Sequence, residues 1–222
     1  YRITKEECLD LPPKVFVKRE VELTKEQRKA YNEMSSLALA LFDQGMTTTV
    51  NALTQLMRLH QITCGHSKLD DGTEINIPTN RITEMMSVVE ETSDKVIIWA
   101  NYRHDIEAIK LALSKEYGMN AVGTYYGDTD DEERRRVVRE FQDLDSELRF
   151  FVGNPRTGGY GLTLTAASTV VYFSNNFDLE VRLQSEDRAH RIGQTKSVTY
   201  VDLMVPGTVD EKPTRAEAQA SA

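Results

Sequence analysis

The chain is organised around the stretch Leu183-Gln184-Ser185-Glu186-Asp187-Arg188-Ala189-His190-Arg191-Ile192-Gly193-Gln194. If residues 179–190 form a helix, a rotation of about 100° per residue brings Gln184, Arg188 and Arg191 onto one face about 60° wide. Two guanidinium groups and an amide on one face can donate forked hydrogen bonds to phosphate or carboxylate oxygens. The alternative interpretation is a solvated helix whose arginines pair with acidic residues of the same helix.

A glycine-rich segment, Gly158-Gly159-Tyr160-Gly161-Leu162-Thr163-Leu164, precedes this stretch. Together the two segments resemble the fifth and sixth helicase motifs of the Swi/Snf-type DNA-translocating ATPases, a branch of helicase superfamily two. In that family the sixth motif reads approximately Gln-Ala-x-x-Arg-x-His-Arg-Ile-Gly-Gln, and this chain departs from it only at Ser185, where the family has alanine. The resemblance extends from about Leu11 to Lys212, which is nearly the whole chain.

The composition is that of a globular chain. Hydrophobic residues make up 40% of the 222 positions and charged residues 28%, which argues against intrinsic disorder. The net charge of −8 argues against nonspecific polyanion binding by the whole surface, although a local basic groove is compatible with it. Cys8 and Cys64 provide no disulfide framework and fit a reducing compartment.

No stretch approaches the ~20 apolar residues of a membrane span, and no secretory signal is present. We therefore expect an intracellular protein without a membrane partner, cytoplasmic if the host is bacterial or viral and nuclear if it is eukaryotic. Because the chain opens with Tyr1 rather than Met, we also expect it to be a piece of a longer protein.

The first 78 residues read as a strand followed by two helices. Residues 14–23 alternate apolar and polar side chains, as a half-buried strand does. Thr24-Lys25-Glu26-Gln27 has the spacing of a capping box and predicts the start of a helix that Gly45 ends. A second helix is predicted over about 49–63. Its apolar residues at core spacing are Leu53, Leu56, Met57 and Leu59.

His60, Cys64 and His66 have the residue types of a metal site. A fourth ligand at a suitable spacing is missing, and the apolar residues around them indicate an amphipathic helix. We therefore expect no metal site in this chain.

From residue 79 to about 210, strands and helices alternate. Thr129-Asp130-Asp131-Glu132 has the spacing of a second capping box, with Thr129 as the cap. Helices are predicted over about 81–91, 104–117, 129–143 and 179–190. Strands are predicted over about 95–100, 121–125, 148–152, 169–173 and 197–204.

Short apolar strands separated by helices of about 10–15 residues indicate an α/β fold, a doubly wound and mostly parallel sheet covered on both faces. The resemblance narrows this to the second RecA-like lobe of a helicase. We therefore expect a strand and a helical appendage packed on the lobe over 1–78, the RecA-like lobe over 79–210, and a loose tail over 211–222.

The resemblance also implies a nucleotide site. The expected arginine fingers, which would act on the γ-phosphate of ATP, are Arg188 and Arg191. The expected nucleotide-binding residues are Gly158, Gly159, Gly161 and Gln184. Asn154-Pro155 stands where family members usually have Ser-Thr, and because proline has no amide hydrogen one expected backbone contact is lost.

Double-stranded DNA is the second partner that the resemblance implies. Because no base-reading module is visible, we expect sequence-independent contacts to the phosphate backbone. The expected DNA-binding residues are Arg103, Arg156, Thr157, Thr163 and Phe177. Phe177 stands near a tryptophan position of many relatives, where an aromatic ring could brace a DNA sugar or fill the core, and we favour the core.

Two sequence signatures of a complete ATP site are missing. The chain has no Gly-x-x-x-x-Gly-Lys-Ser/Thr segment and no Asp-Glu-x-His box. We therefore expect ATP and Mg²⁺ to be bound mainly by a first RecA-like lobe of the same polypeptide, and the present chain alone to be inactive. The alternatives are a noncatalytic interaction module that kept the fold, or a lobe of another superfamily-two enzyme such as an RNA helicase. Both arginines and the glycine loop favour the motor, and the run from His190 to Gln194 favours the Swi/Snf-type branch.

Overall fold

The computed structural model describes residues 11–43, 48–69, 71–157 and 161–211. Gly45, Gly158 and Gly159 lie outside the described residues, as does the expected tail beyond Glu211.

The chain divides into two compact units. The sheet unit takes in the residues up to Arg19 together with Ile82–Leu203, and the helical unit takes in Glu20–Arg81 together with the residues from Met204 onward. This division differs from the expected boundary after residue 78. The first strand groups with the sheet because it is hydrogen-bonded to the last strand.

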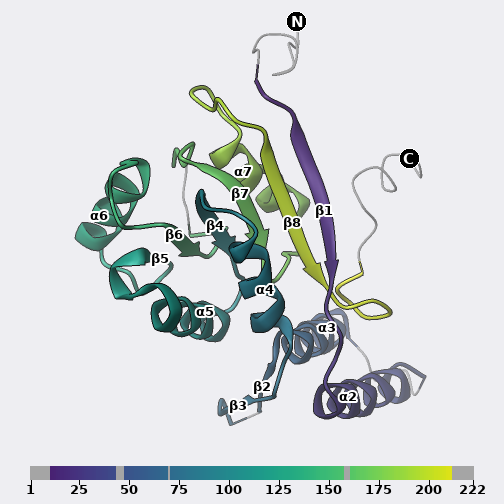
Figure 1. The fold of residues 1–222 in the computed structure, drawn as a ribbon. Helices are drawn as coiled ribbons and strands as arrows, with labels where there is room; N and C mark the ends of the chain where they lie inside the picture. The colour runs from purple at the N-terminus through teal and green to yellow at the C-terminus, as the bar shows by residue number, and fades with distance from the viewer. Residues whose placement is uncertain (1–10, 44–47, 70, 158–160, 212–222) are drawn as a thin grey trace, which may run out of the picture. The chain divides into compact units, whose positions relative to one another are not determined.

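The sheet unit is built on a six-stranded sheet, seen in Figure 1. The pairs β4–β6, β4–β7, β5–β6 and β7–β8 are all parallel, which confirms the predicted α/β fold. In their order across the sheet the strands are β1 (Lys14–Glu20), β8 (Val198–Met204), β7 (Ala167–Tyr172), β4 (Lys95–Trp99), β6 (Phe150–Gly153) and β5 (Val122–Tyr125).

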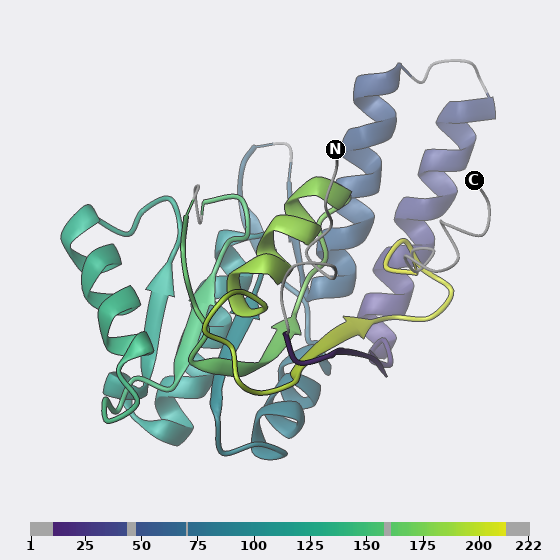
Figure 2. The ribbon, with the colours of Figure 1, turned by 90° about the horizontal axis from the view of Figure 1, so that it is seen from above.

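Helices cover both faces of this sheet, as Figure 2 shows. They are α4 (Arg81–Glu90), α5 (Arg103–Tyr117), α6 (Asp131–Gln142) and α7 (Leu179–Ala189), with a short 3-10 helix η1 (Met119–Ala121) before β5. On one face, Phe141 of α6 and Ala189 of α7 share a buried cluster with Phe151. On the other face, Tyr117 of α5 packs on Phe150, with ring centroids 4.9 Å apart. Adjacent strand residues point to opposite faces, so β6 is buried on both sides.

The start of α6 differs from the prediction. The cap is Asp130 rather than Thr129, and its carboxylate accepts hydrogen bonds from the backbone N–H groups of Glu132 (3.0 Å) and Glu133 (2.9 Å). The Thr129 hydroxyl oxygen instead accepts from the backbone N–H of Tyr126 at 3.2 Å. Aspartate is as good a cap as threonine, and its charge is also favoured by the dipole at a helix N-terminus.

The helical unit contains α2 (Lys25–Asp43), α3 (Thr49–Cys64) and a hairpin of β2 (His66–Lys68) and β3 (Glu74–Asn76). The first capping box is confirmed, because Gln27 N–H donates to the Thr24 hydroxyl (3.1 Å) and Thr24 N–H donates to the Gln27 amide oxygen (3.2 Å). The hairpin strands are too short and polar to give a strand pattern in the sequence.

Core spacing was a poor guide to burial in α3. Leu59 is buried, but the side chains of Leu53 and Met57, predicted to face a core, are 55% and 43% exposed. Leu111 of α5 is another apolar helix residue whose side chain is exposed. The apolar period identifies a helix face, whereas burial also needs a neighbour on that face.

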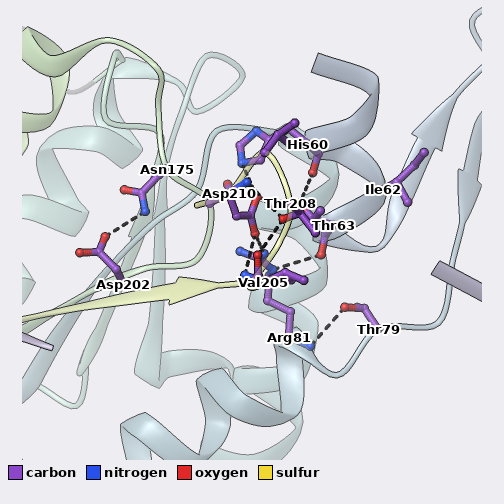
Figure 3. A network of polar contacts seen from close by, with 12 residues as sticks. His60, Ile62, Thr63, Thr79, Arg81, Asn175, Asp202, Val205, Thr208 and Asp210 are labelled. Atoms are coloured by element: carbon purple, nitrogen blue, oxygen red, sulfur yellow. Dashed lines mark hydrogen bonds and ion pairs between the residues drawn. The ribbon is translucent and has the colours of Figure 1, made fainter. Parts of the chain in front are cut away.

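A buried polar network lies within the helical unit and is drawn in Figure 3. Asp210 forms an ion pair with Arg81 and accepts a hydrogen bond from the Thr63 hydroxyl at 2.8 Å. The His60 Nε2 atom lies 3.5 Å from the same carboxylate, and Arg81 Nε donates to the Thr63 carbonyl at 3.2 Å. The network therefore joins the end of α3, the start of α4 and the segment after β8.

Candidate functional site

Four parallel strands of the sheet unit end at one level. Trp99 at the end of β4 lies beside Gly153 of β6 and Tyr172 of β7, and Tyr125 of β5 also lies beside Gly153. The loops that follow the carboxyl ends of parallel strands are where α/β proteins bind ligands. Each of the expected DNA-binding residues Arg103, Arg156, Thr157 and Phe177 follows one of these strands.

A network of amide side chains joins three of these loops. Asn154, after β6, donates its side-chain N–H to the Asn101 carbonyl oxygen, after β4, at 2.8 Å. Asn101 N–H donates to the Ser174 hydroxyl, after β7, at 2.8 Å, and the Asn176 amide lies 3.4 Å from the Asn101 side-chain oxygen. Sequence reasoning missed this network. Its signal is the presence of Asn and Ser directly after buried strands.

Arg156 and Phe177 lie close together at this edge. The Arg156 guanidinium is 3.4 Å from the Asn176 amide oxygen and 3.7 Å from the Asp178 carboxylate, the two residues that flank Phe177. The Phe177 side chain is 42% exposed, so the preferred prediction that it fills the core is wrong. An exposed ring beside an exposed cation fits a surface that meets another molecule.

Arg103 begins α5 and forms an ion pair with Asp128, 2.5 Å away, after β5. Thr157 is half-buried, and its N–H donates to the Asn154 carbonyl at 3.1 Å. Thr163 is half-buried just before Leu164. The structure therefore brings Arg156, Thr157 and Phe177 into neighbouring loops, whereas Arg103 pairs with a different loop.

Helix α7 is fixed to the sheet by a buried cluster around Arg182. Its guanidinium lies 3.4 Å from the centroid of the Tyr172 ring and forms ion pairs with Asp202 and, at 2.9 Å, with Glu186. The Tyr172 hydroxyl is 2.6 Å from the Ser185 hydroxyl. Burial raises the pKa of Tyr172, so this hydroxyl stays protonated. Ser185, the one departure from the motif, therefore has a hydrogen-bonding role in this chain.

Arg188 lies in the last turn of α7 and is only 6% exposed. Burial lowers the pKa of its guanidinium; the hydroxyl groups of Tyr125 and Tyr172 oppose this shift, and the positive charge of Arg191 adds to it. The end of α7 lies near the start of β7, because the Gln194 side-chain amide donates to the carbonyl oxygens of Thr165 (3.1 Å) and Ala167 (2.9 Å). The Arg188 carbonyl accepts a hydrogen bond from Leu164 N–H at 2.9 Å, so α7 is joined to the last residue of the glycine-rich segment.

The expected single helix face of Gln184, Arg188 and Arg191 is wrong. Helix α7 ends at Ala189, so Arg191 lies beyond it in an exposed turn, which Gln194 N–H closes by donating to the Arg191 carbonyl at 3.0 Å. Gln184 is exposed and donates to Glu180 at 2.9 Å, whereas Arg188 is buried. The helix therefore ends before Arg191 could join the other two residues on one face.

Two expected glycine contacts, at Gly158 and Gly159, fall on residues that the structure does not describe. Gly161 has a φ of +104°, a conformation that side chains with a Cβ rarely adopt. The chain needs glycine there for the turn itself.

Among the described residues no helix combines the length and apolar composition that a membrane span requires.

The fold and this edge define a class of protein, the RecA-like helicase lobe. A family model described as the helicase conserved C-terminal domain matches residues 79–193. The chain belongs to this family and, within it, to the SWI2/SNF2-type ATPases of helicase superfamily two, as the two motifs indicated.

Individual relatives agree with this assignment. YwqA of Bacillus subtilis is 30% identical over 93% of the chain, and human SWI/SNF-related matrix-associated actin-dependent regulator of chromatin subfamily A member 1 is 28% identical over 91%. The Sulfolobus solfataricus SWI2/SNF2 ATPase core, solved in complex with double-stranded DNA, matches 93% of the chain with a TM-score of 0.73 and 27% identity. The chain spans only 23% of YwqA, 20% of the human protein and 44% of the solved core.

Proposed function

We propose that this chain is the second RecA-like lobe of an ATP-dependent, double-stranded DNA translocase. In this proposal Arg188 and Arg191 act as arginine fingers on ATP that a first lobe of the same polypeptide binds. The loops at the carboxyl edge of the sheet contact the DNA backbone without reading its sequence.

The observation that carries the proposal is the pair of arginines at the end of α7 and in the turn that follows it. Burial is the main cause that lowers the pKa of the Arg188 guanidinium, and the positive charge of Arg191 lowers it further. A phosphate placed against both guanidinium groups would relieve this repulsion and accept their hydrogen bonds. In phosphoryl transfer, negative charge develops on the oxygens of the γ-phosphate, which is the group that arginine fingers stabilise.

The residues of this chain fit one end of a nucleotide and not the whole of it. Arg188 and Arg191 suit a terminal phosphate, and Gln184 and Gly161 belong to the same two motifs. The sequence has no loop of the Gly-x-x-x-x-Gly-Lys-Ser/Thr type, whose amides and lysine hold the remaining phosphates. Mg²⁺, when bound with ATP on the first lobe, would help to neutralise the negative charge that develops on the phosphate.

The 222-residue chain by itself should therefore release phosphate from ATP only at the background rate, with or without DNA. The physical reason is that the arginines stabilise charge on a phosphate that no part of this chain holds in place. A phosphate-release assay with ATP, Mg²⁺ and duplex DNA measures this, with the complete two-lobe protein as the positive control. Robust turnover by the isolated chain would contradict the half-site proposal.

DNA binding by the chain should be weak, salt-sensitive and indifferent to sequence. Each phosphate neutralised by a lysine or arginine lowers the slope of log K against log salt by about 0.9 on duplex DNA. Replacing Arg156 with alanine should therefore make the slope shallower by about one unit at every sequence tested. Because Arg156 is exposed, with its nearest carboxylate 3.7 Å away, the substitution should leave the fold unchanged.

Fluorescence anisotropy with two duplexes of unrelated sequence, across a salt series, checks this expectation. Arg139→Ala, which removes an exposed arginine from the last turn of α6, at the end of the helix that Lys95 at the start of β4 contacts, is the matched control and should leave the slope unchanged. A strong preference for one duplex, together with little dependence on salt, would count against backbone binding.

A further inference from the structure

Three consecutive residues before and at the start of β1 contact helix α7, its C-cap and strand β8. The Pro12 carbonyl oxygen is 2.7 Å from His190 Nε2, and the Pro13 carbonyl accepts from Val198 N–H at 3.3 Å. The Lys14 ammonium is 3.2 Å from the Glu186 carboxylate. These residues are more than 170 positions apart along the chain, and all of them lie in the sheet unit.

The Lys14 contact completes the pairing of a buried carboxylate. The Glu186 side chain is only 5% exposed, and Arg182 Nε donates to its Oε1 atom at 2.9 Å while Lys14 donates to Oε2 at 3.2 Å. Lys14 also lies 3.8 Å from Asp187 and 5.7 Å from the centroid of the Tyr200 ring. A buried charge that loses one of its partners is strongly destabilised, so Lys14 holds this part of α7 in place.

The Pro12 contact acts one residue before Arg191. His190 is the C-cap of α7, and its backbone N–H donates to the Glu186 carbonyl at 3.1 Å. A carbonyl oxygen can only accept, so His190 donates from Nε2 to Pro12. Glu186 and His190 therefore bracket Arg188, and both are held by residues before and at the start of β1.

We infer that Lys14, together with the Pro12 carbonyl, is a positioning element for the two arginines. It sets where α7 ends and how the Arg191 turn leaves the sheet, without itself touching nucleotide. The segment that enters β1 is thereby mechanically connected to the arginine turn. This inference rests on the proposed function, because it assigns Lys14 to the same half-site.

The distinctive consequence is kinetic. Displacing a catalytic group by about 1 Å can lower the rate by about a hundredfold. In the two-lobe protein, Lys14→Met should lower the DNA-stimulated kcat by ~10- to 100-fold while the KM for ATP changes by no more than about twofold, because the arginines act mainly in the transition state. Lys14→Arg keeps the charge and should restore kcat to within about threefold of wild type.

Lys95→Met is the matched control. Lys95 is a buried lysine of the same unit, and its ammonium donates to the carbonyl oxygens of Glu140 (3.0 Å) and Asp143 (2.5 Å) at the end of α6. This variant should lower the melting temperature as Lys14→Met does and leave kcat unchanged. A second measurement, amide hydrogen exchange of the 222-residue chain, should show faster exchange at His190 and Arg191 in Lys14→Met but not in Lys95→Met.

The inference is overturned if exchange at His190 is unchanged in Lys14→Met, or if kcat falls no further than in Lys95→Met. Arg191→Ala, assayed beside these variants, distinguishes a failure of the positioning role from a failure of the proposed function. If Arg191→Ala is inactive while Lys14→Met turns over like wild type, only the positioning role is wrong. If Arg191→Ala itself keeps full activity, the proposed function is wrong.

Discussion

Replacing Arg191 with alanine in the two-lobe protein should lower DNA-stimulated ATP turnover by about 10³- to 10⁵-fold. That loss corresponds to about 4–7 kcal/mol of transition-state stabilisation. Arg191 is exposed and lies beyond the end of α7, so the substitution removes no packing from the core. An exposed ion pair is worth only about 0–1 kcal/mol, so only a catalytic role makes the loss so large.

Steady-state kcat and KM at saturating DNA measure this effect. Arg135→Ala, another exposed arginine of the sheet unit, should keep kcat within about twofold of wild type. Arg188→Ala should also be inactive, but Arg188 is buried and its loss adds a folding cost, so Arg191 gives the cleaner result. Turnover of Arg191→Ala within a few-fold of wild type would rule out the finger role.

Replacing Asp210 with alanine should destabilise the helical unit by about 3–5 kcal/mol, the usual cost of breaking a buried ion pair on one side. The substitution leaves the fully buried Arg81 guanidinium without its carboxylate and removes the acceptor of the Thr63 hydroxyl (Figure 3). Urea denaturation of the 222-residue chain, followed by circular dichroism, measures the change in the free energy of unfolding.

Glu22→Gln is the matched control, because it removes the same charge from an exposed position of the same unit and should change stability by less than about 0.5 kcal/mol. Replacing both Arg81 and Asp210 with apolar residues of similar size should recover much of the loss, since neither charge then remains buried alone. A midpoint for Asp210→Ala that equals that of wild type would show that the network contributes nothing.

The sheet could be predicted because its strands are buried on both faces. Residues 96–99 read as one apolar run, and all four are buried in the structure. The burial of helix side chains was harder to predict, as the exposed Leu53 and Leu111 show. The apolar period of a helix reveals one face but not whether another element covers it. The two capping boxes, one confirmed and one displaced to Asp130, show how neighbouring cap residues compete.

The candidate site, like the fold, was only partly predictable from the sequence. Arg188 and Arg191 could be found because each belongs to a short local motif. The difference in exposure between the two arginines could not be predicted, because it depends on α7 ending at Ala189, two residues before Arg191. The network around Asn101 was also beyond reach, because it depends on the register of three strands that are far apart in the sequence.

Binding of ADP with aluminium fluoride, compared with binding of ADP alone, tests the central claim most directly. This pair mimics the phosphoryl group in transfer, and analogues of transition states bind about 10²-fold or more tighter than ground-state ligands. The account predicts that the two-lobe wild-type protein shows such a gain, and that Arg191→Ala loses most of it with an unchanged affinity for ADP. A variant that keeps the full gain would contradict the claim that this lobe completes an ATP site.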